Sequence, residues 1–335
     1  MSRITADRRA QVAQRGWATW RAATQRALYG DDGFYRRADG GPAEHFRTSV
    51  HASPVFARAV LSLARAAGLG LVVDVGGGRG ELARSLHQLD PSLELLVVEV
   101  APRPVDLPAA VGWADSVPPE VAGLVVANEW LDNVPVDVVE LTSDGVRLVE
   151  VDPTGRERLG GPPSDRDVAW LAEWWPVAEV GARAEVGHPR DEAWASVVSS
   201  VRGGLAVSVD YAHTRADRPY AGSLTGYRHG RQVPPVPDGS CDVTAHVALD
   251  ACASAGVSAG ATATLLTTQR AALHALGVRA VAPAPDLAAH DPMGYLSAVV
   301  SASSVAELTG PGGLGGFGWL VQAVGTDLPE PLASA

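Results

Sequence analysis

The chain has 335 residues with 46% hydrophobic side chains, which is enough to bury a full core without disulfides or metal ions. A formal charge of −11 at pH 7 and a pI near 5.3 disfavour nucleic acid as a partner, because phosphate binding depends on clustered cations. Its two cysteines, Cys241 and Cys252, indicate neither a disulfide framework nor a zinc site. No apolar leader and no run of about 18 apolar residues is present. We therefore expect a cytoplasmic protein with no metal, no membrane insertion and no nucleic-acid partner.

Two helical patterns open the chain. Apolar residues recur at helical spacing over residues 5–28, and turn-forming residues follow directly. A second helical pattern covers residues 53–68, where Gly68 supplies the stop. Both patterns are typical of helices that pack one apolar face on a core.

A strand, a loop and a helix are predicted next. Residues 71–75 form an apolar run interrupted by Asp74, residues 76–80 are rich in glycine, and residues 81–89 have a helical pattern. Three later apolar runs are typical of parallel strands buried on both faces: residues 95–100, 123–127 and 205–209. The alternation predicts an α/β, Rossmann-like fold with a mostly parallel sheet and helices on both faces.

The segment between the last two of these strands is long enough to be an insertion. Residues 136–141 and 146–151 flank Ser143-Asp144-Gly145, which predicts a hairpin. Residues 162–202 then have the pattern of helices. We treat residues 136–202 as an insertion into the main domain.

The C-terminal third contains one unusual segment. Residues 213–242 are rich in Gly, Pro, Tyr and Arg and are too long for an ordinary connection, and loops of this length tend to be functional or disordered. Residues 317–324 predict a last strand. Residues 326–335 are expected to form a flexible tail.

The glycine loop distinguishes between nucleotide-binding folds by its register. Its glycines are Gly76, Gly77, Gly78 and Gly80. A dinucleotide-binding loop that starts at Gly76 would have glycine in place of Glu81, and the Gly-Lys-Ser/Thr of a phosphate-binding loop is absent. An acid, Asp74, followed by glycines at alternate positions instead lets the backbone approach a nucleoside and a methionine moiety whose ammonium Asp74 would bind. We therefore predict S-adenosylmethionine as the cofactor, against the alternative of a turn without function.

Two more acids follow the next strands. Glu99 lies near the end of the second strand, where a carboxylate can accept both hydroxyls of a ribose. Asp115, in the loop before the third strand, could meet the adenine amino group. A solvated acid at a strand end is the alternative interpretation of Glu99.

Polar residues at the end of the third strand suggest an acceptor site. Asn128, Glu129 and Asp132 stand in the block Asn128-Glu129-Trp130-Leu131-Asp132-Asn133-Val134-Pro135. If the acceptor is a guanidinium, two carboxylates could pair with its N–H groups and hold one nitrogen towards the methyl. The alternative is that Asn128 and Asp132 merely cap the following helix.

In their order, these residues resemble the MidA family, which includes mitochondrial complex I assembly factors that act as protein arginine methyltransferases. The likeness extends to about residue 280. The remaining blocks that carry it are Ala27-Leu28-Tyr29-Gly30, Gly33-Phe34-Tyr35, Phe46-Arg47-Thr48-Ser49, Val98-Glu99-Val100-Ala101-Pro102, Trp113-Ala114-Asp115-Ser116, Asp210-Tyr211, Asp242-Val243-Thr244-Ala245-His246-Val247 and Thr268-Gln269.

The resemblance implies a class I methyltransferase fold, S-adenosylmethionine as the cofactor and a protein arginine as the acceptor. It adds Thr48 and Asn128 to the expected cofactor-binding residues. On this basis residues 1–50 are an N-terminal helix and a loop that covers the cofactor, and residues 51–325 are the methyltransferase domain. His45 and His51 stand where the family commonly has acids, which puts its acceptor preference in doubt here.

Three functions remain open at this point. The first is methylation of an arginine in a partner protein. The second is methylation of a small molecule, with residues 213–242 as a lid. The third is a cofactor-binding assembly factor without turnover, and a homodimer is left open in each case.

Overall fold

A computed structural model of the chain describes residues 16–31, 33–36, 49–52, 54–284 and 286–333. Thr48, His45 and the part of the first predicted helix before residue 16 lie outside the described residues, as does the side chain of His51. The expectations for these positions stay predictions.

Among the described residues, seven strands form a central sheet in the order β16-β17-β10-β5-β2-β3-β4. In that order their bounds are Ala263–Thr268, Gly318–Val324, Val201–Asp210, Val121–Asn128, Leu71–Val75, Glu94–Val98 and Val111–Ala114. All neighbours from β10 to β4 are parallel, whereas β17 is antiparallel to β10 and to β16. The sheet is therefore mixed, and the predicted parallel arrangement holds for the strands from β10 to β4. An apolar run has the same pattern in either direction, so the reversal of β17 could not be predicted.

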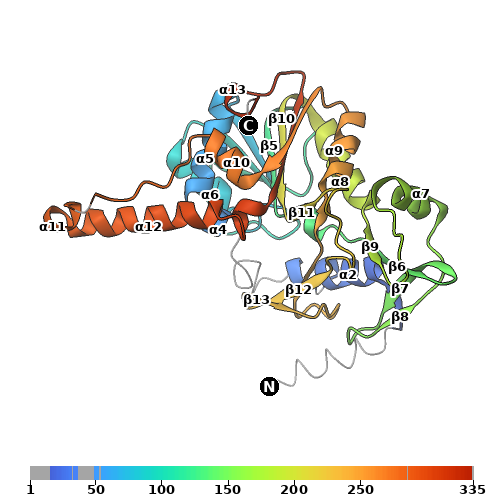
Figure 1. The fold of residues 1–335 in the computed structure, drawn as a ribbon. Helices are drawn as coiled ribbons and strands as arrows, with labels where there is room; N and C mark the ends of the chain where they lie inside the picture. Colours follow the sequence, from blue (N-terminus) through green and yellow to red (C-terminus); the bar gives the residue numbers. More distant parts are fainter. Residues whose placement is uncertain (1–15, 32, 37–48, 53, 285, 334–335) are drawn as a thin grey trace.

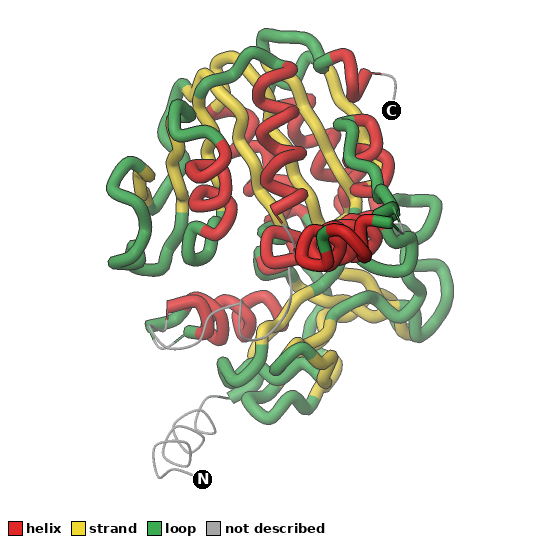
Figure 2. The backbone as a smooth tube through the Cα atoms, turned by 90° about the vertical axis from the view of Figure 1, so that its left-hand side faces the viewer, coloured by secondary structure: helices red, strands yellow, loops and turns green. Residues whose placement is uncertain are grey.

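Helices cover both faces of this sheet, as predicted (Figures 1 and 2). One face carries α5 (Pro54–Ala66), α6 (Glu81–Leu89), α10 (Gln269–Ala275) and the C-terminal end of α12 (Pro292–Thr309). The other face carries α8 (His188–Ser200) and α9 (Leu249–Ser258). Besides α13 (Glu330–Ala333) at the C-terminal end, the short helical elements are η1 (Phe34–Arg36), α4 (Ser49–Ala52), η2 (Leu131–Asn133), α11 (Leu287–His290) and η3 (Leu314–Gly316).

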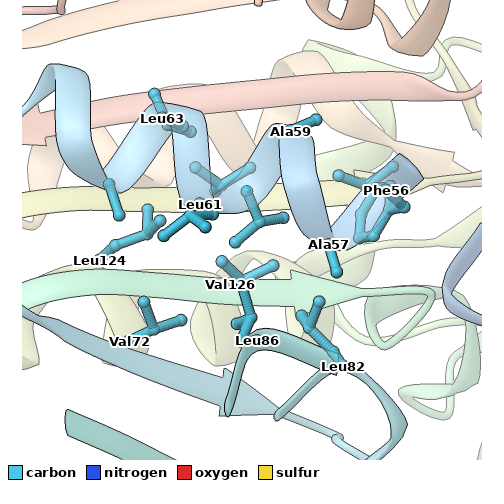
Figure 3. Packing of buried hydrophobic residues seen from close by; sticks show 14 of the residues in the cluster. Phe56, Ala57, Ala59, Leu61, Leu63, Val72, Leu82, Leu86, Leu124 and Val126 are labelled. Carbon is cyan, nitrogen blue, oxygen red and sulfur yellow. The ribbon is translucent and has the colours of Figure 1, made fainter. Parts of the chain in front are cut away.

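The central strand β5 divides its side chains between the two faces. Leu124 and Val126 pack in the core with α5 and α6, whereas Val125 and Ala127 pack in the core with α8 and α9. Figure 3 shows Leu124 and Val126 beneath α5. A strand buried on both faces explains why its sequence is a continuous apolar run.

We expect Val126→Ala to lower the free energy of unfolding by about 1 to 3 kcal/mol, because it leaves a cavity in a fully packed layer. Val126 is 1% exposed, whereas Val180 is 67% exposed and is a matched control. Urea denaturation of the two alanine variants measures both effects. A loss for Val126→Ala no larger than that for Val180→Ala would contradict this packing.

A second β region lies beneath the central sheet (Figures 1 and 2). Its strands are β1 (Ala18–Thr19), β7 (Gly145–Val151), β6 (Asp137–Thr142) and β9 (Arg183–Val186), with β8 (Glu157–Leu159) beside β7. The predicted hairpin is confirmed as β6 and β7. The helical expectation for residues 162–202 is confirmed for α7 (Asp165–Trp174) and α8, but β9 stands between them and pairs with β6. Because α8 packs on the central sheet, the separate region ends before it and not at residue 202.

Among the described residues of the first predicted helix, α2 (Trp20–Tyr29) is helical, whereas residues 16–19 are not. Ala18 and Thr19 are instead extended and pair with β7. The Thr19 side chain accepts a hydrogen bond from the Ala22 N–H and caps the helix. Pairing with a strand more than 100 residues away overrides the local helical pattern.

Residues 213–242 and the C-terminal end are more structured than expected. The long segment contributes to β11 (Ala212–His213), β12 (Thr225–Arg228) and β13 (Arg231–Val233), and β12 also pairs with β14 (Asp242–Thr244), while β11 pairs with β15 (Val247–Ala248). Where a flexible tail was expected, α13 (Glu330–Ala333) buries Leu332 completely against the core with α5 and α10. Leu328, which is partly buried, packs against the same core. In the described parts of the chain, no helix is long and apolar enough to cross a membrane.

Candidate functional site

A cavity of about 630 Å³ lies at the carboxyl ends of the parallel strands. The loops after β2, β3, β4 and β5 form its walls, the C-terminal half of α8 closes one side, and Tyr29 and Tyr35 reach it from the N-terminal segment. Open α/β sheets bind their ligands at this edge. Five acids line the cavity: Asp74, Glu81, Glu99, Asp115 and Glu129.

The glycine loop has the backbone shape that its sequence predicts. Gly76, Gly78 and Gly80 have φ angles of 68°, 58° and 80°, which other residues adopt only with strain. A Cβ at Gly76 would lie 2.6 Å from Cδ1 of Trp130. Glycine therefore allows both the turn into α6 and the close contact with the loop after β5.

Asp74 is a buried acid with one unsatisfied oxygen. It is 4% exposed, and its Oδ2 atom has no hydrogen-bond partner among the described residues. Burial, with a smaller contribution from Glu81 and Glu99, raises the pKa of Asp74 to about 7. A buried polar atom without a partner at a cavity wall fits a ligand ammonium group.

We expect the affinity for S-adenosylhomocysteine to rise roughly eightfold between about pH 6 and pH 7.5, because a carboxyl with a pKa of about 7 is mostly neutral below that range and ionised above it. Asp74→Asn should weaken binding roughly 10- to 100-fold and remove this pH dependence. Titration calorimetry at several pH values measures both effects. If the affinity of the Asp74→Asn variant still rose with pH as it does in the original chain, the assignment of Asp74 to the ligand ammonium would be wrong.

Glu99 links the end of β3 to the glycine loop. Its Oε2 atom accepts a hydrogen bond of 3.0 Å from the Gly78 N–H, and its Oε1 atom accepts from the N–H groups of Val100 and Ala101. Each carboxylate oxygen can accept further hydrogen bonds, so contact with a ribose stays compatible with this arrangement. Asp115 is exposed at the rim of the cavity and accepts a hydrogen bond from the Ser116 hydroxyl.

Glu129 lies in the cavity wall in a strained conformation. Its φ angle is 50°, and its backbone N–H donates to the Val209 carbonyl. Its Oε1 atom accepts from the Ser49 N–H at 2.9 Å and from Asn128 Nδ2 at 3.2 Å. Desolvation raises the pKa of Glu129 to about 8, although the Ser49 hydrogen bond opposes this shift. Asn128 also lines the cavity, and its Oδ1 atom has no partner among the described residues.

Asp132 lies behind the wall and is not one of the residues that line the cavity. It is 6% exposed, and its Oδ2 atom accepts from the Thr244 hydroxyl at 2.7 Å. The Arg190 guanidinium donates to the Asp132 carbonyl and to two other backbone carbonyls. The structure therefore brings Glu129 and Asn128 to the cavity, whereas Asp132 lies behind the cavity wall and supports it. The capping alternative is not what η2 shows, because the N–H groups of Leu131 and Asp132 donate to Asp210 Oδ2 and not to Asn128 or Asp132.

Sequence reasoning assigned no role at the cavity to several of its other residues. These are Tyr29, Tyr35, Trp130 and Asn133, together with Ser196, Val197 and Ser200 of α8. The first four stand in sequence blocks that carry the family resemblance, and this was the one sign in the sequence that they could belong to the site. The α8 residues offered none, because only the tertiary fold brings that helix to the cavity.

Comparison with known proteins decides the family. Residues 55–267 match the model of a family described as "Putative S-adenosyl-L-methionine-dependent methyltransferase". The chain belongs to this family. S-adenosylmethionine is the cofactor of the family, so the predicted cofactor and the resemblance to MidA are confirmed at this level. No curated protein matches the chain.

Two solved structures are similar over almost the whole chain. A COG1565 superfamily member from Burkholderia thailandensis, bound to S-adenosyl-homocysteine, is 26% identical with a TM-score of 0.79, over 97% of this chain and 92% of that one. A native structure of a COG1565 superfamily protein, also from Burkholderia thailandensis, is 26% identical with a TM-score of 0.79, over 98% of this chain and 94% of that one. MidA belongs to the same superfamily.

Proposed function

We propose that this methyltransferase has the class I fold and methylates the guanidinium group of an arginine in a partner protein. The observation that carries the proposal is the acidic lining of the cavity. Five acids line it, and none of its described lining residues is Arg or His. The nearby Arg190 is 3% exposed, donates to backbone carbonyls and has acids next to its charge, among them Asp132 and Glu185, so it does not make the cavity cationic. Such a cavity favours a cationic cofactor and a cationic acceptor.

The strand order supports the class I assignment. The parallel strands from β10 to β4 carry the cofactor loops at one edge, and β17 is the reversed strand beside β16. At that edge of the sheet, Asp74 Oδ2 is available for the cofactor ammonium, and the loop of Gly76, Gly78 and Gly80 provides a surface without side chains. Glu99 and Asp115 would hold the ribose and the adenine.

Glu129 and Asn128 would orient the acceptor. When bound, S-adenosylmethionine supplies the methyl group: the acceptor nitrogen forms the new N–C bond, and the electron pair of the broken C–S bond stays on sulfur. The Glu129 carboxylate would accept N–H hydrogen bonds from the guanidinium, whose positive charge favours the ionised form of this acid. It would also take up the proton that the nitrogen loses. Most of the rate would come from positioning, with Asp132, Thr244 and Arg190 supporting the loop.

Paired peptides test this acceptor. The protein is incubated with methyl-labelled S-adenosylmethionine and a library of arginine peptides, each matched to the same peptide with citrulline or lysine in place of arginine. We expect label on a guanidino nitrogen, located by fragmentation mass spectrometry, and none on citrulline or lysine. Label on lysine, or only on small molecules, would overturn the proposed acceptor.

A further inference from the structure

Two tyrosines and an asparagine also line the cavity and have no part in the proposed methyl transfer. Tyr29 and Tyr35 both line the cavity, and their rings stack with centroids 5.6 Å apart and an interplanar angle of 22°. Asn133, from the loop after β5, lines the same cavity. Asp242, at the start of β14, lies behind them and is 1% exposed.

Hydrogen bonds fix both tyrosines in place. The Tyr35 hydroxyl donates to Asp242 Oδ1 at 3.1 Å, and the Tyr29 hydroxyl donates to the Asn133 carbonyl at 3.2 Å. Asn133 Nδ2 also donates to Asp242 Oδ1, at 3.0 Å. The hydroxyls are thus held on the Asn133–Asp242 side, and the rings are immobilised as part of the cavity wall.

We propose that Tyr29 and Tyr35 form an aromatic clamp that selects a cationic acceptor through its contact with the tyrosine rings. An aromatic ring attracts a guanidinium through its face, and the attraction is stronger where water is excluded. The stacked pair lines the same cavity as Glu129, which follows β5. Asp242 and Asn133 act as positioning residues for the clamp. This inference rests on the proposed function, because it concerns the acceptor that the same cavity would bind.

The test measures binding of two probes to the protein saturated with S-adenosylhomocysteine. N-acetyl-arginine amide carries the cation, and N-acetyl-citrulline amide is its neutral isostere. We expect the original chain to prefer the arginine probe, and Tyr29→Leu to reduce that preference roughly tenfold while Tyr29→Phe keeps most of it. Tyr35→Phe, which releases the ring from Asp242, should give an intermediate loss.

Tyr220→Phe is the matched control. Its hydroxyl also donates a single hydrogen bond, to the Val180 carbonyl at 3.1 Å, but the residue is exposed and does not line the cavity. It should leave the preference unchanged. Because each variant can also be titrated with S-adenosylhomocysteine alone, an effect on the acceptor can be separated from an effect on the cofactor.

The outcomes separate the two proposals. If the original chain shows no preference for the arginine probe, the proposed acceptor is wrong and the clamp fails with it. If the original chain prefers arginine but Tyr29→Leu and Tyr35→Phe keep that preference, only the clamp is wrong. Equal loss of affinity for S-adenosylhomocysteine in Tyr29→Leu would also overturn it, because the ring would then act on the cofactor and not on the acceptor.

Discussion

Gly78→Leu is expected to abolish binding of S-adenosylmethionine while the protein remains folded. Gly78 has a φ of 58° and lines the cavity, and a Cβ there would meet only Glu81 Oε2, at 3.2 Å. A leucine side chain is therefore free to occupy the space that the cofactor needs. Titration calorimetry measures the loss.

Backbone strain alone could also weaken the variant, and Gly68→Leu controls for it. Gly68 has a φ of 68°, and a Cβ there has no neighbour within 4 Å, but the residue follows α5 and does not line the cavity. We expect Gly68→Leu to be destabilised to a similar extent and still to bind the cofactor. Normal binding by Gly78→Leu, or equal loss in both variants, would contradict the assignment of the loop.

Glu129→Gln is expected to bind S-adenosylmethionine normally and to transfer its methyl group roughly 100-fold or more slowly. The amide oxygen of glutamine can still accept the hydrogen bond that Glu129 receives from the Ser49 N–H, so the wall keeps its shape. What it loses is the negative charge and the ability to take up a proton. Single-turnover rates on an arginine peptide measure the effect.

The pH dependence gives a second readout of the same residue. Because the pKa of Glu129 is raised to about 8, the carboxylate form is favoured as the pH rises, and the rate should rise with it. Glu129→Gln should lose that rise, whereas Glu94→Gln, at an exposed position on β3, should keep both the rate and its pH dependence. Turnover of Glu129→Gln at the original rate would show that the acceptor site lies elsewhere.

The cofactor half of the site could be predicted from sequence because its signals are local. Asp74 and the glycines that follow it are consecutive along one strand, loop and helix, so their spacing alone fixes their relation to each other. The apolar runs for β2, β3, β5 and β10 were equally direct, because buried parallel strands need no polar face. The direction of β17 has no such signature.

The acceptor half could be predicted only in part, because it is assembled by contacts between distant segments. Glu129 and Asp132 are three residues apart, and their spacing did not reveal that one would line the cavity while the other hydrogen-bonds to Thr244 behind it. Tyr35 and Asp242 are 207 residues apart, and nothing in either local pattern indicates that they meet. Sequence patterns indicate which blocks matter, but packing decides which side chains reach the ligand.

Titration calorimetry of the purified protein with S-adenosylmethionine and, separately, with NAD tests the cofactor assignment on which the whole account depends. The geometry of Asp74, the glycine loop and Glu99 predicts binding of one S-adenosylmethionine per chain and no binding of NAD. Binding of NAD, or of neither compound, would contradict it.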